Sequence, residues 1–191
     1  MKKLSMLFAL AMLFTVAANA QEFKKFKVGV GAGYAIPGGN GAKGGVLFYA
    51  EPSYKVQDQL QIGLRMEFAA MARGFSEDVG DTEFKVSTSG SYTLNAQYYF
   101  NNNSFRPFVG AGFGMYSIKA ASFDGDEELD LGLQDETKFG FYPRVGFDAG
   151  HFTLSLDYNL IGKTEIEGTD FSFKNSYIGI RFGGFFGGGR K

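Results

Sequence analysis

The sequence contains no cysteine and no tryptophan, and only one of its 191 residues is histidine. The absence of cysteine excludes a disulfide scaffold, a thiolate zinc site and a cysteine nucleophile. A single histidine argues against a multi-histidine metal centre and against a Ser-His-Asp hydrolase. The net charge of −1 lacks the basic signature of a nucleic-acid-binding protein. We therefore expect no nucleic-acid partner, no cofactor and no catalytic residue.

Glycine and aromatic residues are abundant instead. The chain has 28 glycines, 22 phenylalanines and 10 tyrosines, so that 17% of its residues are aromatic. This composition is neither that of a disordered chain nor that of an ordinary helical protein. The length suits one domain, and the composition favours strands.

The first twenty residues have the order of a secretory signal peptide. Two lysines precede an apolar run, and Ala18-Asn19-Ala20 forms a small-x-small cleavage site. The apolar run is shorter than the roughly 20 residues that a membrane helix needs. We predict a signal peptide at residues 1–20 and one domain at residues 21–191. Beyond residue 20 no run of 18 apolar residues occurs, so a membrane-spanning part would have to use strands.

Eight segments alternate between apolar and polar residues with a period of two, which is typical of strands with one apolar face. The clearest is HFTLSLDYNL at residues 151–160. The predicted strands are residues 26–35, 46–55, 60–68, 92–100, 105–118, 139–149, 151–160 and 177–186. Eight is an even number that a small membrane barrel can close on. Pro52 and Pro143 fall inside two of these strands and are expected to weaken them.

The predicted joins alternate strictly between short and long. The short joins are residues 56–59, 101–104 and 149–151, and the long ones are 36–45, 73–84, 119–138 and 162–173. This alternation places all long joins at one end, as in outer-membrane barrels with short periplasmic turns and long extracellular loops.

Charged residues occur singly on the polar faces of the strands, among Gly, Ser, Thr and Asn. A water-exposed exterior would carry more Lys and Glu, so the pattern favours an apolar face toward lipid and a polar interior. A turn centred on Asp58 would put Glu51 opposite Arg65, and Asp157 would lie directly or diagonally across from Arg144. The charges expected in the interior are Glu51, Arg65, Glu67, Arg144, Asp148, Asp157 and Arg181.

Buried ions need partners, because an isolated ion in a low-dielectric interior costs several kcal/mol. One interpretation is that these charges pair and plug a barrel too narrow for an open pore. The alternative is a gate whose pairs exchange to open a narrow channel.

Glycines and aromatic residues add two expectations about the faces. Glycines at positions 29, 31 and 33 and at 110, 112 and 114 recur at period two, and are expected to form a bare inner face with room for long side chains such as Arg181. Aromatic residues near the strand ends predict interfacial girdles. Their members are Tyr54, Phe100, Phe105, Phe152 and Phe186 at the short-turn end, and Tyr34, Phe48, Tyr92, Tyr116, Phe139 and Tyr177 at the other.

Acidic residues gather in three of the long joins and predict an acidic rim. They are Glu77, Asp78, Asp81 and Glu83; Asp124, Asp126, Glu127, Glu128, Asp130, Asp135 and Glu136; and Glu165, Glu167 and Asp170. Such a field could recruit divalent cations that bridge to lipopolysaccharide, or a basic extracellular partner, or it could simply keep the loops solvated. Asp124, Asp126, Glu128 and Asp130 alternate as in a calcium loop. They lack the sixth-position glycine and the flanking helices of an EF-hand, so they are weak candidates and no metal site is predicted.

The eight alternating segments, the run Arg106-Pro107-Phe108-Val109-Gly110-Ala111-Gly112-Phe113-Gly114 and the final strand of glycines and aromatics resemble the small outer-membrane β-barrel family of OmpA/OmpX type. The resemblance implies an all-β fold: an eight-stranded antiparallel up-and-down transmembrane β-barrel. It also implies the outer membrane of a Gram-negative bacterium, contact with lipid and lipopolysaccharide, and a monomer.

Three functions remain open. The first is a non-enzymatic, membrane-anchored scaffold whose acidic extracellular loops serve surface interaction or envelope integrity. The second is a narrow or gated channel for small solutes, and the third is a soluble periplasmic β-barrel that binds an apolar ligand. A lipid-modifying enzyme would need its histidine near the outer leaflet, whereas His151 falls in a short turn at the other end. Apolar residues such as Ile62 at the barrel centre, with Arg65 in water, would identify the soluble barrel.

Overall fold

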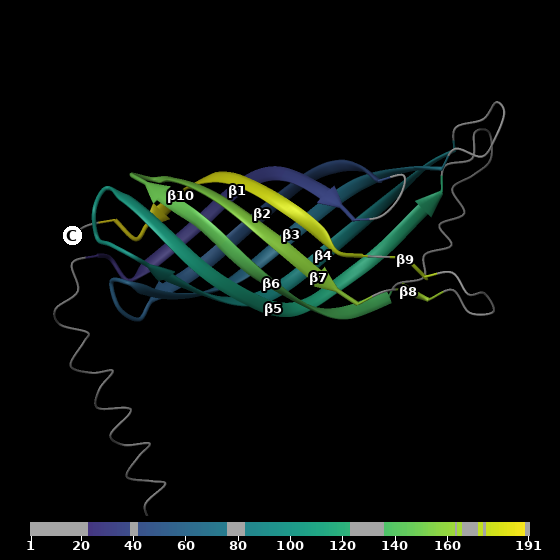
Figure 1. Cartoon of the computed structure of the whole chain (residues 1–191). Helices are drawn as coiled ribbons and strands as arrows, with labels where there is room; N and C mark the ends of the chain where they lie inside the picture. Colours follow the sequence, from purple (N-terminus) through teal and green to yellow (C-terminus); the bar gives the residue numbers. More distant parts are fainter. Residues whose placement is uncertain are drawn as a thin grey trace, which may run out of the picture.

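The structure is a computed structural model that describes residues 23–38, 42–75, 83–122, 136–162, 164–165, 172–173 and 175–189. Its long strands are β1 (Phe26–Pro37), β2 (Ala42–Lys55), β3 (Leu60–Phe75), β4 (Glu83–Tyr99), β5 (Phe105–Ser122), β6 (Glu136–Ala149), β7 (Phe152–Ile161) and β10 (Tyr177–Gly187). They form a closed barrel in the ring order β1-β10-β7-β6-β5-β4-β3-β2 (Figure 1). All neighbouring strands are antiparallel, which confirms the predicted fold class.

Two further elements and the termini complete the arrangement. A two-residue pair, β8 (Thr164–Glu165) with β9 (Ser172–Phe173), lies between β7 and β10. β10 ends near the short turns, and the strand ends that border the long joins, such as those at Phe75 and Ser122, lie at the opposite end of the barrel (Figure 1). Among the described residues, no helix is long and apolar enough to cross a membrane. The predicted signal peptide at residues 1–20 lies outside the described residues.

Several strands continue past their predicted ends on the long-join side. The apolar alternation of β3 stops at Phe68 and that of β4 begins at Tyr92, yet backbone pairing continues to Phe75 opposite Glu83. β5 likewise extends to Ser122. The sequence prediction misses these residues because it follows apolar side chains, whereas the hydrogen-bond ladder uses only the backbone.

Each proline inside a strand leaves a gap in one ladder. Between β2 and β3 the pairing passes from Ala50 opposite Met66 to Ser53 opposite Gly63, and Pro52 lies in the interval. Between β6 and β7 a similar interval contains Pro143. On their other sides both prolines remain in register, opposite residues of β1 and β5. The expected weakening therefore affects the pairing on only one side of each proline, because proline lacks a single backbone N–H donor.

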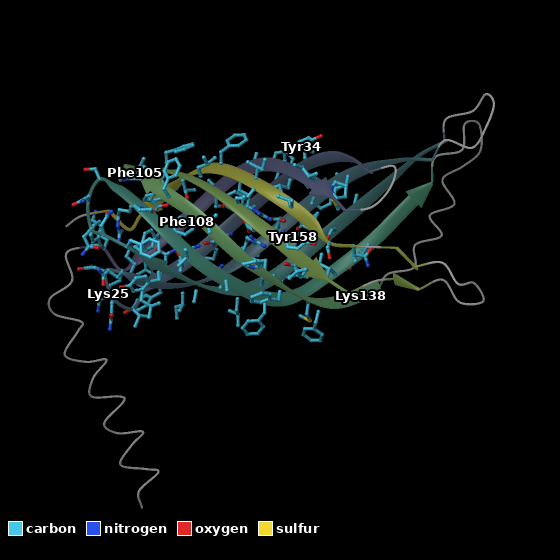
Figure 2. The ribbon with its side chains drawn as sticks, viewed as in Figure 1. Lys25, Tyr34, Phe105, Phe108, Lys138 and Tyr158 are labelled. Carbon is cyan, nitrogen blue, oxygen red and sulfur yellow. The ribbon has the colours of Figure 1, made fainter. Side chains whose placement is uncertain are left out.

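The apolar side chains point out of the barrel. Ile62 is 48% exposed and Leu156 46%, whereas Arg65 and Asp157 are 0% and 1% exposed. Figure 2 shows the same contrast within β5, where Phe105 is exposed and Phe108 is buried. The soluble barrel with an apolar interior is therefore wrong, because its apolar residues would have to face inward.

The aromatic girdles form with two exceptions. Nine of the eleven predicted members are exposed on the outer face. Tyr116 and Tyr177 are 0% and 1% exposed and lie inside, so their assignment to the outer girdle was wrong. Tyr116 follows the outward Met115 and therefore points inward, where its hydroxyl donates to Asn159 Oδ1 at 2.9 Å. Alternation within the strand decides the face of an aromatic residue, and nearness to a strand end does not.

Candidate functional site: the charged barrel interior

The interior at mid-barrel holds a network of buried ions. Arg181 of β10 contacts Glu67 of β3 through two bonds, Nε to Oε2 at 2.6 Å and Nη2 to Oε1 at 2.8 Å. The Tyr177 hydroxyl donates to Glu67 Oε1 at 2.6 Å. Arg181 Nη1 lies 2.7 Å from Asp157 Oδ1. The guanidinium therefore joins two acids that come from different sides of the barrel.

Arg65 adds a second guanidinium to the network. Its Nη1 donates to Asp157 Oδ2, and its Nη2 donates to Asn159 Oδ1 at 3.1 Å. Its Nε lies 3.7 Å from Glu67 Oε2. The guanidinium carbon stands 3.8 Å from the centre of the Tyr142 ring, a cation–π distance.

Arg144 completes the network. Its Nη1 donates to Glu51 Oε2 at 2.8 Å, and its Nε lies 3.4 Å from Asp157 Oδ2. Gln97 Nε2 donates to Glu51 Oε1 at 2.8 Å. Asp157 thus contacts all three arginines. Three arginines face three carboxylates, so this network is electroneutral.

The contacts reach across the lumen and do not follow the strand pairing alone. Arg144 lies directly opposite Asp157 on adjacent strands, as the turn geometry predicted. The β2–β3 register also brings Glu51 opposite Arg65, but the Glu51 carboxylate bonds Arg144 of β6 instead. β2 and β6 are four positions apart in the ring of eight strands. An eight-stranded barrel is narrow enough for long side chains to meet across it.

Asp148 belongs to a second cluster at the short-turn end. Its Oδ2 accepts from Lys27 Nζ at 2.6 Å and from the Tyr99 hydroxyl at 2.9 Å. The Arg106 guanidinium stands 4.2 Å from the Tyr99 ring and 4.0 Å from the Phe23 ring. Phe23 is 5% exposed, and its backbone N–H donates to Asp58 Oδ1. This cluster of cations and rings fills the end of the barrel below the central network.

The sequence prediction missed several members of both clusters. The inward position of Lys27 could have been predicted from the sequence, because Lys27 lies an even number of residues from Gly29 and Gly31 and therefore on the same face of β1. Gln97 and Asn159 also lie on polar faces, yet nothing in the sequence distinguishes them from other polar residues. Their roles depend on which side chain reaches them from across the barrel.

Glycines at two of the predicted positions make room for inward side chains, although not for Arg181. A Cβ on Gly31 would meet the Tyr49 ring at 2.8 Å, and one on Gly112 would meet the Tyr142 hydroxyl. The space for Arg181 comes from Gly179, where a Cβ would collide with the guanidinium. The expectation that the β1 glycines accommodate Arg181 was therefore wrong, because the Arg181 side chain folds back along its own strand.

Most of the acidic rim, with its metal candidates, falls outside the described part of the chain. Asp124, Asp126, Glu128 and Asp130 lie outside the described residues, as do most of the other acids of the long joins. Within the described part of the chain, no group of three metal-ligating side chains comes together.

The sequence of this barrel matches a known protein family. A family model described as "Outer membrane protein beta-barrel domain" matches residues 6–184. The chain belongs to this family. Outer membrane protein W of Vibrio cholerae serotype O1 (strain ATCC 39315 / El Tor Inaba N16961) is 28% identical over 161 residues, which cover 73% of this chain and 72% of that protein.

Solved structures of outer-membrane proteins share the fold. OprG from Pseudomonas aeruginosa superposes with a TM-score of 0.55 at 14% identity, covering 87% of this chain and 98% of that chain. Neisserial surface protein A also gives 0.55, at 17% identity, with 84% and 94% covered. This member of the outer-membrane barrel family is therefore a protein of the bacterial outer membrane.

Proposed function

We propose that this protein is a non-enzymatic, membrane-anchored scaffold with a closed interior, which displays acidic extracellular loops for surface interaction or envelope integrity. The central ion network supports this proposal most directly. Arg65, Arg144 and Arg181 extend into the lumen from three strands and interlock with three carboxylates. Such a network leaves a stable plug where a diffusion porin would have a water-filled opening.

The strand lengths support the display of loops. A transmembrane strand needs about 9–11 residues. On β4 the exposed apolar residues run from Tyr92 to Tyr98, while the strand begins at Glu83. The remaining part of β4, with those of β3 and β5, extends the barrel wall about 20 Å beyond the apolar band at ~3.3 Å per residue and ~40° tilt. Figure 1 shows these strands extending toward the end of the long joins.

The chemistry of the loops suggests their partners. Seven acids lie between Asp124 and Glu136 at the ends of the long strands β5 and β6. This charge would attract divalent cations that bridge to lipopolysaccharide, or a basic extracellular partner. Lipid and lipopolysaccharide around a monomeric barrel are the partners we propose.

The test compares two variants of the same loop in proteoliposomes. In one, Asp124, Asp126, Glu127, Glu128 and Asp130 become the corresponding amides. In the control, each Asp becomes Glu and each Glu becomes Asp, which preserves the charge. We expect a fluorescent oligolysine peptide to bind wild type and the control in a salt-dependent manner, and to lose this binding to the amide variant. Equal binding to all three proteins would overturn the role of the loop acids.

The second candidate is a narrow channel for small solutes, and unpartnered polar atoms favour it. Ser89 Oγ, Ser91 Oγ and both amide atoms of Asn95 are buried on the inner face of β4 without a hydrogen-bond partner among the described residues. A cavity of about 20 Å³ between Lys27 and Glu51 has room for a single water. Buried polar atoms normally bond to protein or ordered water, so these positions suit a hydrated path beside the plug.

Conductance in planar bilayers separates the two candidates. The scaffold predicts no sustained conductance from wild-type protein. A steady single-channel current would favour the channel, and we expect that current to depend on Arg144 and Glu51, an ion pair that lines the small cavity.

A further inference from the structure

A long apolar groove crosses the outer surface of the barrel from β1 to β6. Its volume is about 700 Å³, within the range of roughly 300–1,000 Å³ typical of ligand sites. The floor is a row of inward-facing strand positions, two of them glycines, so that mainly backbone faces outward: Ser53, Gly63, Asn95 and Gly112.

Two rows of outward side chains form the walls of the groove. The lower row comprises Phe26, Tyr54, Ile62, Ala96 and Ala111, which are successive partners on β1 to β5. The upper row comprises Leu64, Leu94, Phe113 and Phe141. The small side chains at Ala96 and Ala111 keep the groove open where larger residues would close it.

The groove runs obliquely across the strands, from the short-turn end toward the middle of the barrel. Phe26 is the first residue of β1, whereas Ala96 lies three residues before the end of β4 and Ala111 six residues after the start of β5. At ~3.3 Å per residue and ~40° tilt, the distance along the barrel axis from the start of β5 to Ala111 is about 15 Å. This distance is half of the ~30 Å hydrocarbon core. The short turns of outer-membrane barrels face the periplasm. The groove therefore spans the depth of the periplasmic leaflet.

A cation lies at the lower end of this path. Lys24 is exposed and lies two residues before Phe26, just ahead of the start of β1. Its backbone is held against the C-terminal segment by a 2.8 Å bond from its N–H to Gly189 O. Figure 2 shows the neighbouring Lys25 at the same short-turn end, where lipid headgroups meet water.

We propose that this groove and Lys24 form a docking site for one anionic glycerophospholipid of the periplasmic leaflet. The acyl chain lies between the two walls, and the phosphate contacts the Lys24 ammonium. Three features of the groove fit this lipid. The groove extends over the thickness of one leaflet, its lining is apolar, and the phosphate at its short-turn end would meet the positive charge of Lys24.

The absence of tryptophan permits a direct test. A single tryptophan is introduced at Leu94, in the upper wall, and in a separate control at Phe182 on β10, which is four strands away in the ring. The two positions match, because each lies five residues before the end of its strand and they are 55% and 52% exposed. Each protein is placed in phosphatidylcholine vesicles containing either brominated phosphatidylglycerol or brominated phosphatidylcholine, and quenching of the tryptophan gives the relative association of the lipids.

We expect Leu94→Trp to favour the anionic lipid about fivefold, the equivalent of ~1 kcal/mol for one lysine near an anionic headgroup, and Phe182→Trp to show no preference. Lys24→Gln should abolish the preference at Leu94→Trp, and so should Ala96→Phe, which fills the groove while retaining the charge. Circular dichroism and urea titration confirm folding of each variant. If both tryptophans show the same preference for the anionic lipid, or if the preference survives Ala96→Phe, the quenching comes from bulk lipid around the barrel. Either result would overturn the proposal.

Discussion

Replacing Asp157 by Asn removes the carboxylate that contacts all three central arginines while leaving the shape of the side chain almost unchanged. In wild type Asp157 is 1% exposed and forms ion pairs with Arg65, Arg144 and Arg181. The substitution leaves three buried arginines with only two carboxylates. Arginine remains protonated in proteins, so the excess positive charge cannot be removed by deprotonation. Breaking a buried ion pair from one side typically costs about 3–5 kcal/mol, and we expect a loss of unfolding free energy in this range.

The matched control is Asp148→Asn in the short-turn cluster. Asp148 is also buried, but its cationic partner is a lysine at 2.6 Å, and a buried lysine can lose its proton when its acid is removed. We expect this variant to lose about 1–3 kcal/mol. A second control, Asp157→Asn combined with Arg144→Gln, restores the charge balance and should recover part of the lost stability.

The assay is urea unfolding of protein refolded into phosphatidylcholine vesicles, followed by circular dichroism and by heat-modifiable migration on gels. Equal slopes among variants show that the same surface is exposed on unfolding. Asp157→Asn within about 1 kcal/mol of wild type, or no less stable than Asp148→Asn, would refute the central role of this carboxylate.

Three further predictions follow from the interior contacts. Gly112→Ala should cost about 1–3 kcal/mol, because its Cβ collides with Tyr142; urea titration should show a smaller cost in a Tyr142→Ala background. Phe23→Ala removes the ring stacked on Arg106, and hydrogen exchange of the first residues of β1 should accelerate while that of mid-barrel strands is unchanged. Lys27→Met leaves the Asp148 carboxylate without its cation, and should lower the urea midpoint by more than Lys27→Arg does.

Local pattern was enough to predict the strands and their faces. The alternation around Ile62 and Leu156 identified the outward rows, and the polar positions between them correctly placed Arg65 and Asp157 in the interior. The short turns were also predictable, because residues 56–59 and residues 101–104 each separate two adjacent segments that alternate between apolar and polar residues. The strand extensions to Phe75 and Ser122 were not, since backbone pairing there continues without an apolar face.

The sequence by itself therefore determined that the strands have one face for lipid and one for ions, because a period of two is a property of each strand alone. Only the tertiary structure decided which ions meet. Arg144 reaches Glu51 and Arg181 reaches Glu67 across the ring, between strands that are not neighbours in the sheet. These partners follow from closure, since bending eight strands into a narrow ring brings opposite walls within the length of two side chains.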